Sequence, residues 1–235
     1  MLVFATALAG IAAVVTAIAL LGPNIDLAVA SLFYDPATKE FLAGKNSPFA
    51  LLRDHGVVAM LTCAGFVGLA IRTSSRWRLP NVPGRAAAFL TLSLLIGPGL
   101  LVNVVLKDNW GRPRPGSVVE LGGTQNYVNW WSLRGTCQAN CSFASGEAAA
   151  AAWMFGPAML APPHWRAAAM AGAATFTVAM GVLRIASGGH FLTDVVFGAL
   201  ISLVVLLAIY KLVFGWPGSV QRYLRRKRST SSTAA

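Results

Sequence analysis

Long apolar segments alternate with short polar ones along most of the chain. Six of them are rich in Leu, Val, Ile, Ala and Phe, and they cover roughly 2–22, 56–71, 86–106, 143–161, 167–185 and 191–215. A helix needs about 20 apolar residues to cross the hydrocarbon core of a bilayer. The second segment is short, but residues 50–52 can extend it. The pattern predicts an all-α polytopic membrane protein with six transmembrane helices.

Two features near the N-terminus need separate interpretation. The first segment lacks a preceding basic region and further apolar segments follow it, so we expect a retained helix rather than a signal peptide. Residues 24–34 are expected to form a short amphipathic helix that Asn24 could cap. This helix could lie in the membrane interface, with Phe33 and Tyr34 at headgroup level, or it could pack on the bundle as a loop helix.

Composition separates this chain from soluble proteins. Of its 235 residues, 56% are hydrophobic and 11% are charged, whereas soluble domains carry roughly 25% charged residues. The net charge of +11 raises the question of nucleic acid. Each basic cluster holds a single aromatic, Trp77 or Tyr223, and is not interleaved with aromatics in the way that single-strand binders require, so no nucleic-acid partner is expected. These clusters are Arg72, Arg76, Arg78 and Arg85, and Arg222, Arg225, Arg226, Lys227 and Arg228.

The same basic clusters predict the orientation of the chain. Lys and Arg concentrate on the cytoplasmic side of membrane proteins, so both termini and the loop at 72–85 are expected in the cytoplasm. Residues 23–55, 107–142 and 186–190 then lie on the opposite side. We expect a single membrane domain over residues 1–235, with a basic, disordered tail at 222–235. The oligomeric state cannot be predicted.

Cysteine usage points to a possible disulfide and not to a metal. Cys63 lies within an apolar segment, whereas Cys137 and Cys141 lie in the longest polar loop. If that loop faces an oxidising compartment, the two could form a small disulfide loop. No further Cys or His accompanies them at zinc-ligand spacing.

Three polar clusters adjoin the ends of apolar segments on the predicted non-cytoplasmic side. The first, residues 107–115, contains Lys107, Arg112 and Arg114 with two prolines. Arg binds a phosphate dianion bidentately and Lys adds a point charge. The alternative is a basic anchor at the membrane edge, although positive charge on that side opposes the topology rule.

The second cluster, residues 142–147, opens the fourth apolar segment. Ser142 or Ser145 could cap the helix, and Gly146 would let a ligand approach the backbone at the positive end of the helix dipole. The alternative is an ordinary capped helix in which the negative charge of Glu147 interacts favourably with the positive end of the helix dipole. The alanine run at 148–152 would let neighbouring helices approach closely.

The third cluster, residues 184–194, joins the fifth and sixth segments. His190 and Asp194 are four residues apart and therefore share a helix face. Asp194 is expected to accept a hydrogen bond from one ring nitrogen of His190 and so leave the other free as a nucleophile. Arg184 and two glycines adjoin the pair, and this combination favours catalysis over a structural histidine.

These clusters resemble the three motifs of the type 2 phosphatidic acid phosphatase (PAP2) superfamily. Lys107, six residues and then Arg114 with Pro115 resemble the first motif, and Ser145 with Gly146 resembles the core of the second. Arg184, five residues, His190, three residues and Asp194 match the third in full. The motif core spans residues 107–194. The resemblance implies the helical bundle shared with vanadium haloperoxidases.

The resemblance also implies roles for the matching residues in a metal-independent lipid phosphatase. His190 would attack phosphorus to form a phosphohistidine and Asp194 would orient it. The phosphate oxygens would be bound by Lys107, Arg114, Ser145, Gly146 and Arg184. Arg112 falls outside the matching spacing, so its replacement by alanine is expected to have a milder effect than that of Arg114.

One position departs from the family pattern. The second motif usually reads Pro-Ser-Gly-His, whereas this chain has Ala144-Ser145-Gly146-Glu147. The family histidine protonates the leaving oxygen, and Glu147 could do so only in its protonated form. We interpret Glu147 as a general acid; the alternative is a catalytically impaired site.

The loop at 137–143 is similar to a bacterial subgroup that includes lipid A phosphatases. Lipid A is therefore the first expectation for the substrate, with phosphatidylglycerol phosphate, undecaprenyl diphosphate and phosphatidic acid as alternatives. A phosphotransferase with a lipid acceptor, or a non-catalytic protein that binds anionic lipid, would share these motifs. The expected location is the bacterial inner membrane, with the site facing the periplasm.

Overall fold

The computed structural model describes residues 10, 13–17, 22, 24–44, 47–51, 55 and 84–215. The predicted first segment, 2–22, lies mostly outside these residues, and the second segment, 56–71, and the basic tail lie outside them altogether. The helices and strands are α2 (Ile25–Ser31), β1 (Tyr34–Asp35), β2 (Glu40–Phe41), α4 (Gly84–Leu94), η1 (Leu95–Leu106), α5 (Lys107–Asn109), η2 (Pro115–Ser117), η3 (Val119–Leu121), α6 (Gly146–Trp153), α7 (Phe155–Leu160), α8 (Pro163–Ala186) and α9 (Leu192–Phe214).

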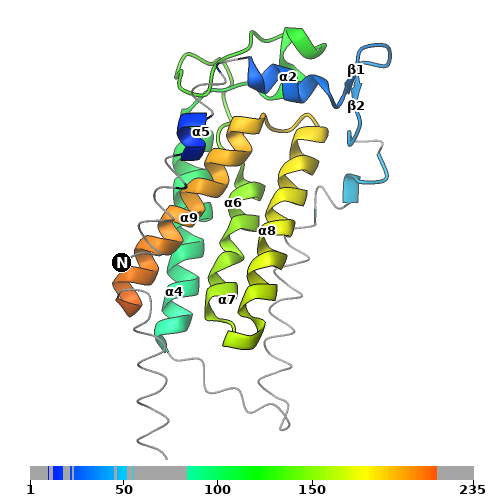
Figure 1. Ribbon diagram of the computed structural model, residues 1–235. Coiled ribbons are helices and arrows are strands. Elements are labelled where there is room, and N and C mark those ends of the chain that lie inside the picture. Colours follow the sequence, from blue (N-terminus) through cyan, green and yellow to red (C-terminus); the bar gives the residue numbers. More distant parts are fainter. Residues whose placement is uncertain are drawn as a thin grey trace, which may run out of the picture.

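The long helices run side by side beneath a cap of shorter elements. Figure 1 shows α4, α6, α8 and α9 alongside one another, with α2, the β1–β2 hairpin and the loop between α5 and α6 gathered over one end. The hairpin is a two-stranded antiparallel ribbon in which Tyr34 pairs with Phe41. The cap is therefore mostly loop, and most of the hydrophobic side chains belong to the long helices.

Three of the predicted apolar segments are confirmed as long helices. Among the described residues, three helices are long and apolar enough to cross a membrane: Gly84–Asn109, Pro163–Ala186 and Leu192–Phe214. The first of these is a continuous rod of α4, η1 and α5, in which η1 has the wider π-helical turn around Pro98. The chain is thus mostly helical.

The segment at 143–161 differs from its prediction as one continuous span. It forms two short helices, α6 and α7, that meet at Met154. Pro157 has no N–H to donate to the carbonyl four residues earlier, so the regular helical ladder cannot continue through this point. Met154 N–H instead donates to Ala151 O, three residues back, at 3.1 Å.

Small residues bring α6 into close contact with α9. Ala148, Ala149, Ala151 and Ala152 are fully buried, as the alanine run predicted. On the α9 side, a Cβ at Gly198 would overlap the backbone carbonyl of Ser145. Below this contact, the core packs large side chains of α4, α6 and α9 together, namely Phe89, Trp153, Val205, Leu206 and Ile209.

The short helix predicted at 24–34 packs on the bundle. Its helical part is α2, in which Ala30 is fully buried against Val118, Leu121 and Phe191. Asn24 occupies the N-cap position, but its side chain makes no capping hydrogen bond. The loop-helix alternative therefore describes α2 better than a helix lying in the membrane interface.

The close contact at Gly198 predicts that a methyl group added there lowers the melting temperature, whereas one added at an uncrowded glycine does not. The Gly198→Ala protein should unfold at a lower temperature in detergent, because overpacking against backbone costs about 1–3 kcal/mol. Gly172→Ala in α8 is the matched control, since a Cβ there meets nothing within 4 Å and alanine favours a helix. Equal melting temperatures for the two variants would contradict the close α6–α9 approach.

Candidate active site

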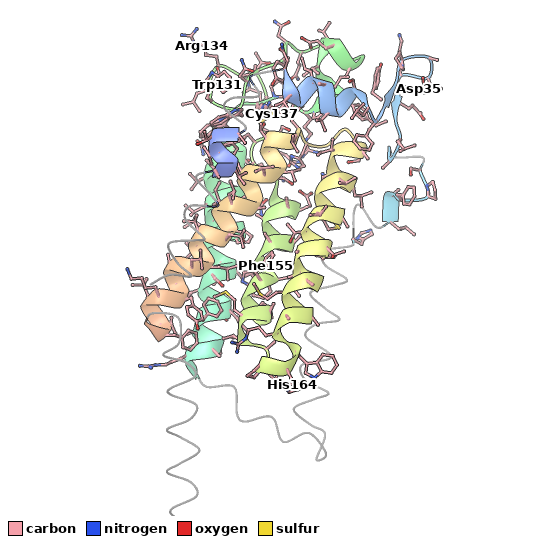
Figure 2. All side chains as sticks on the ribbon, viewed as in Figure 1. Asp35, Trp131, Arg134, Cys137, Phe155 and His164 are labelled. Carbon is pink, nitrogen blue, oxygen red and sulfur yellow. A yellow bond between two sulfur atoms is a disulfide. The ribbon has the colours of Figure 1, made fainter. Side chains whose placement is uncertain are left out.

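The three polar clusters meet at the capped end of the bundle. Lys107 ends the first long helix, Glu147 lies in the first turn of α6, and His190 precedes α9. Figure 2 places Trp131, Arg134 and Cys137 at this same end and His164 at the opposite end. Segments that are far apart in sequence thus contribute to a single site.

His190 is fully buried and held by a backbone carbonyl. Its Nδ1 lies 2.7 Å from Ser142 O. A carbonyl oxygen can only accept a hydrogen bond, so Nδ1 carries the proton and the neutral ring presents a lone pair at Nε2. Nε2 has no hydrogen-bond partner among the described residues. The ring is therefore held in one orientation with Nε2 free of hydrogen bonds to the described residues.

The orienting acceptor differs from the one predicted. Asp194 Oδ2 lies 4.0 Å from His190 Nδ1, beyond hydrogen-bond distance. It accepts instead from the Ser142 hydroxyl and from Phe191 N–H at 2.8 Å. Asp194 is the third residue of α9, and a carboxylate there reaches back to the first N–H groups of its helix. Asp194 thus acts on His190 through Ser142.

Glu147 and Arg184 close the other side of the imidazole. Arg184 Nη2 is 3.2 Å from Glu147 Oε1, and His190 Nε2 is 3.3 Å from Glu147 Oε2. The second contact lies within ion-pair distance without hydrogen-bond geometry. Within the described ranges, Arg184 Nε, His190 Nε2 and Glu147 Oε2 are all buried without hydrogen-bond partners. Such a group of unpaired polar atoms suits a polar ligand.

Arg114 is positioned by the disulfide loop. Cys137 and Cys141 are joined, and Asn140 between them accepts from the guanidinium through both its backbone and side-chain oxygens, at 2.8–3.2 Å. Cys141 N–H donates to Lys107 O at 3.2 Å. The loop therefore holds two of the predicted phosphate-binding residues in one place.

Ser145 and Gly146 serve the geometry of α6. Ser145 Oγ accepts from Ala148 N–H at 3.3 Å, which confirms it as the N-cap. Its own N–H donates to Asp194 O at 3.0 Å, so that donor is occupied. A Cβ at Gly146 would overlap the Asn103 side chain. Ser145 and Gly146 thus fix the start of α6, whose first turn carries Glu147.

A buried ion cluster lies under the site, and the sequence patterns did not predict it. Arg112 is fully buried and forms ion pairs with Asp194 and with Asp26 of α2. Asp26 also accepts from Thr193 N–H at 2.9 Å and from the Thr193 hydroxyl at 2.6 Å. Tyr127 OH lies 3.2 Å from Arg112 Nη2. The only local signal was the isolated acid in the apolar face of residues 24–34.

The surroundings of several ionisable groups in this cap shift their pKa values. Burial lowers the pKa of His190, although Glu147 opposes that shift. Burial also opposes the charge on Arg112, but Asp194 and Asp26 outweigh it and its pKa is raised. The pKa of Arg114 is lowered by burial and by the nearby charge of Arg184. The site thus favours a neutral His190 beside permanent cations.

Burial of Arg112 corrects the expectation that its replacement would be mild. Arg112→Ala should prevent stable folding or sharply lower the melting temperature, because removing one partner of a buried pair costs about 3–5 kcal/mol. Arg114→Ala should melt near the wild-type temperature, since that side chain is only partly buried. Similar melting temperatures for both variants would contradict the role of the ion cluster.

Known proteins are similar to this chain in sequence. The model of the PAP2 superfamily matches residues 86–217. A protein of Rhizobium leguminosarum named Lipid A 4'-phosphatase is 48% identical over 120 residues, which is 51% of this chain and 52% of that protein. A protein of the same name from Francisella tularensis subsp. novicida is 29% identical over 204 residues, 83% of this chain and 89% of that protein.

The matches cover different fractions of the relatives' lengths. The chain spans about half the length of the Rhizobium relatives, since the one from Rhizobium etli is matched over 47% of its length. No solved structure matches the chain. The family match covers more than half of the chain and contains Lys107, Glu147 and His190, so the chain belongs to the PAP2 superfamily.

Proposed function

We propose that this protein is a membrane lipid phosphatase that works through a phosphohistidine. The observation that carries the proposal is the hydrogen bond from His190 Nδ1 to Ser142 O, which leaves the lone pair of Nε2 directed at Glu147 and Arg184. A nucleophile needs such a free lone pair and a fixed orientation. The lowered pKa of His190 keeps the ring neutral near neutral pH.

The phosphate would be bound by a group of cations around Nε2. Arg184, Arg114 and Lys107 lie close enough to interact electrostatically with one another and with Glu147. Bringing like charges together is unfavourable unless an anion joins them, so the cluster suits a phosphate dianion. Removing one such contact commonly lowers the rate by about 10²–10³-fold.

The reaction then has two balanced steps. In the first, Nε2 of His190 forms a bond to phosphorus while the bond between phosphorus and the lipid oxygen breaks, and the leaving oxygen takes up a proton. In the second, water attacks phosphorus and gives one proton to the Glu147 carboxylate, the P–N bond breaks, and inorganic phosphate leaves with His190 restored. Asp194 supports the ring through Ser142 in both steps, and no metal or cofactor takes part in this scheme.

Glu147 is proposed to give the proton to the leaving oxygen. Without substrate, its ion pair with Arg184 favours the carboxylate form. A bound phosphate would compete for Arg184 and add negative charge beside Glu147, and both effects favour its protonation. Glu147 also touches Nε2, so an arriving phosphorus must displace it from the ring.

Lipid A is the substrate that the relatives favour, since proteins of that activity by name match this chain over 120–204 residues. We place the protein as a single domain in the bacterial inner membrane with both termini in the cytoplasm. The site, at the end of the bundle that carries the disulfide loop, would then face the oxidising periplasm.

The proposal predicts loss of turnover without loss of folding in His190→Ala. The purified full chain should release phosphate from one or more of lipid A, phosphatidylglycerol phosphate, undecaprenyl diphosphate and phosphatidic acid in mixed micelles. The variant should release none and should fail to trap labelled phosphate from a radiolabelled donor. His164→Ala, at the opposite end of the bundle, is the control and should remain active.

The same assay separates the alternatives. Label that passes to a second lipid rather than to water would identify a phosphotransferase with the same intermediate. A folded wild-type protein that turns over none of these lipids would leave a non-catalytic anionic-lipid-binding protein.

The pH profile of Glu147→Gln tests the proposed acid. Glu147 raises the pKa of His190, and the reaction needs the neutral ring, so kcat/KM should fall at low pH as the ring is protonated. Without the Glu147 charge, this acidic limb should move to lower pH, while turnover should drop at every pH. Glu120→Gln, on the exposed turn η3, should match wild type. Full turnover in Glu147→Gln would exclude the acid role.

A further inference from the structure

A half-open pocket of about 450 Å³ lies beside the proposed phosphate-binding cations. Arg114 forms part of its wall and also interacts with Arg184 and Glu147. Ser117 forms another part, and the preceding Gly116 donates its N–H to Gly188 O at 3.1 Å. Gly188 belongs to the turn that carries His190, so the pocket includes one of the proposed cations, Arg114, and its wall is hydrogen-bonded through Gly116 to the turn of the proposed nucleophile.

The pocket wall combines polar groups with the apolar Pro113 and Ala139 and, apart from Arg114, is uncharged. Amides and hydroxyls supply the other polar groups, namely Ser117, Gln125, Thr136, Gln138 and Asn140. A second phosphate would require a further cation, which is absent from the residues that line this pocket, and an acyl chain would require a wholly apolar wall. A sugar ring presents both hydroxyl groups and apolar C–H faces, so it fits a mixed wall. The wall therefore suits a neutral ligand with several hydroxyl groups.

Gln125 holds an unsatisfied acceptor in this wall. Its Oε1 is buried and has no hydrogen-bond partner in the part of the chain that the structure describes. The backbone around it is firmly placed, because Gln125 N–H donates to Ser117 O at 2.8 Å and Gln125 O accepts from Val119 N–H at 2.9 Å. A buried acceptor without a donor is unfavourable, so a turn of the Gln125 amide toward the pocket would be favoured where a ligand hydroxyl could donate to Oε1.

The opposite wall is equally constrained. The disulfide between Cys137 and Cys141 closes the loop, and Cys137 N–H donates to Gly111 O at 3.0 Å. Asn140 within that loop is already bonded to Arg114. Both walls thus exist before a ligand arrives, which lowers the entropic cost of binding.

We propose that this pocket binds the sugar ring that carries the scissile phosphate, with a ring hydroxyl donating to Gln125 Oε1. The inference rests on the proposed phosphatase function and adds to it the position and chemistry of headgroup recognition. Arg114 would hold the phosphate at the boundary between the pocket and His190. Selectivity for phosphorylated glycolipids over other phosphate monoesters follows from the neutral wall.

The test compares two substrates in the Gln125→Leu protein, which keeps the side-chain size and removes the acceptor. Its KM for lipid A should rise about threefold to tenfold, the effect of one neutral hydrogen bond, with kcat unchanged. Its KM for phosphatidic acid, which has no sugar, should equal that of wild type. The assays need a detergent without a sugar headgroup, because such a headgroup would compete for the pocket.

Asn129→Leu is the matched control. Asn129 Oδ1 is likewise buried without a partner among the described residues, but Asn129 does not line the pocket. Equal KM values for lipid A in both variants, or a parallel change for both substrates in Gln125→Leu, would overturn the inference. If wild type still hydrolyses these lipids, the proposed phosphatase function survives that result.

A binding measurement tests the pocket in the case where the wild-type chain shows no turnover. If the wild-type chain hydrolyses no lipid, binding of phosphate-free, dephosphorylated lipid A is measured in the same detergent. Weaker binding by Gln125→Leu than by Asn129→Leu would support the sugar pocket although the phosphatase proposal had failed. Equal binding by the two variants would overturn the pocket as well.

Discussion

The architecture of the cap depends on one buried guanidinium between two carboxylates. Arg112 joins Asp26 of α2 to Asp194 of α9, and all three side chains are almost completely excluded from solvent. An isolated charge in such surroundings is very unfavourable, so each of the three requires the others. Because the partners come from α2, the loop after α5 and the first turn of α9, the cluster fixes how the cap sits on the helical bundle.

This cluster also determines the geometry of the nucleophile. Asp194 faces Arg112 with one oxygen and the Ser142 hydroxyl with the other, and the Ser142 carbonyl in turn orients His190. Asp194 is thereby committed to a network of charge-assisted hydrogen bonds, which are stronger than neutral ones. The imidazole is aligned through the backbone, and the negative charge of Asp194 is directed at Arg112 and the Ser142 hydroxyl.

Two separate sets of cations serve different purposes at this end of the bundle. Arg112 is neutralised by its carboxylates and belongs to the scaffold, whereas Arg114, only two residues later, bonds to the uncharged Asn140. Pro113 and Pro115 restrict the backbone between and after them. The side chains of the two arginines therefore diverge, one into the protein and one toward the site.

The sequence by itself determined the parts of the protein that depend on local pattern. The length of the apolar segments predicted the long helices at 86–106, 167–185 and 191–215, and the position of the polar clusters at the segment ends predicted that Lys107, Glu147 and His190 lie at the same end. Tertiary structure alone decided the partners of Arg112, the packing of α2 and the acceptor for His190 Nδ1. Asp26 lies 86 residues from Arg112 and 167 residues from Thr193. Contacts at such separations depend on how helices pack, and neither local periodicity nor residue spacing encodes which buried charges will meet.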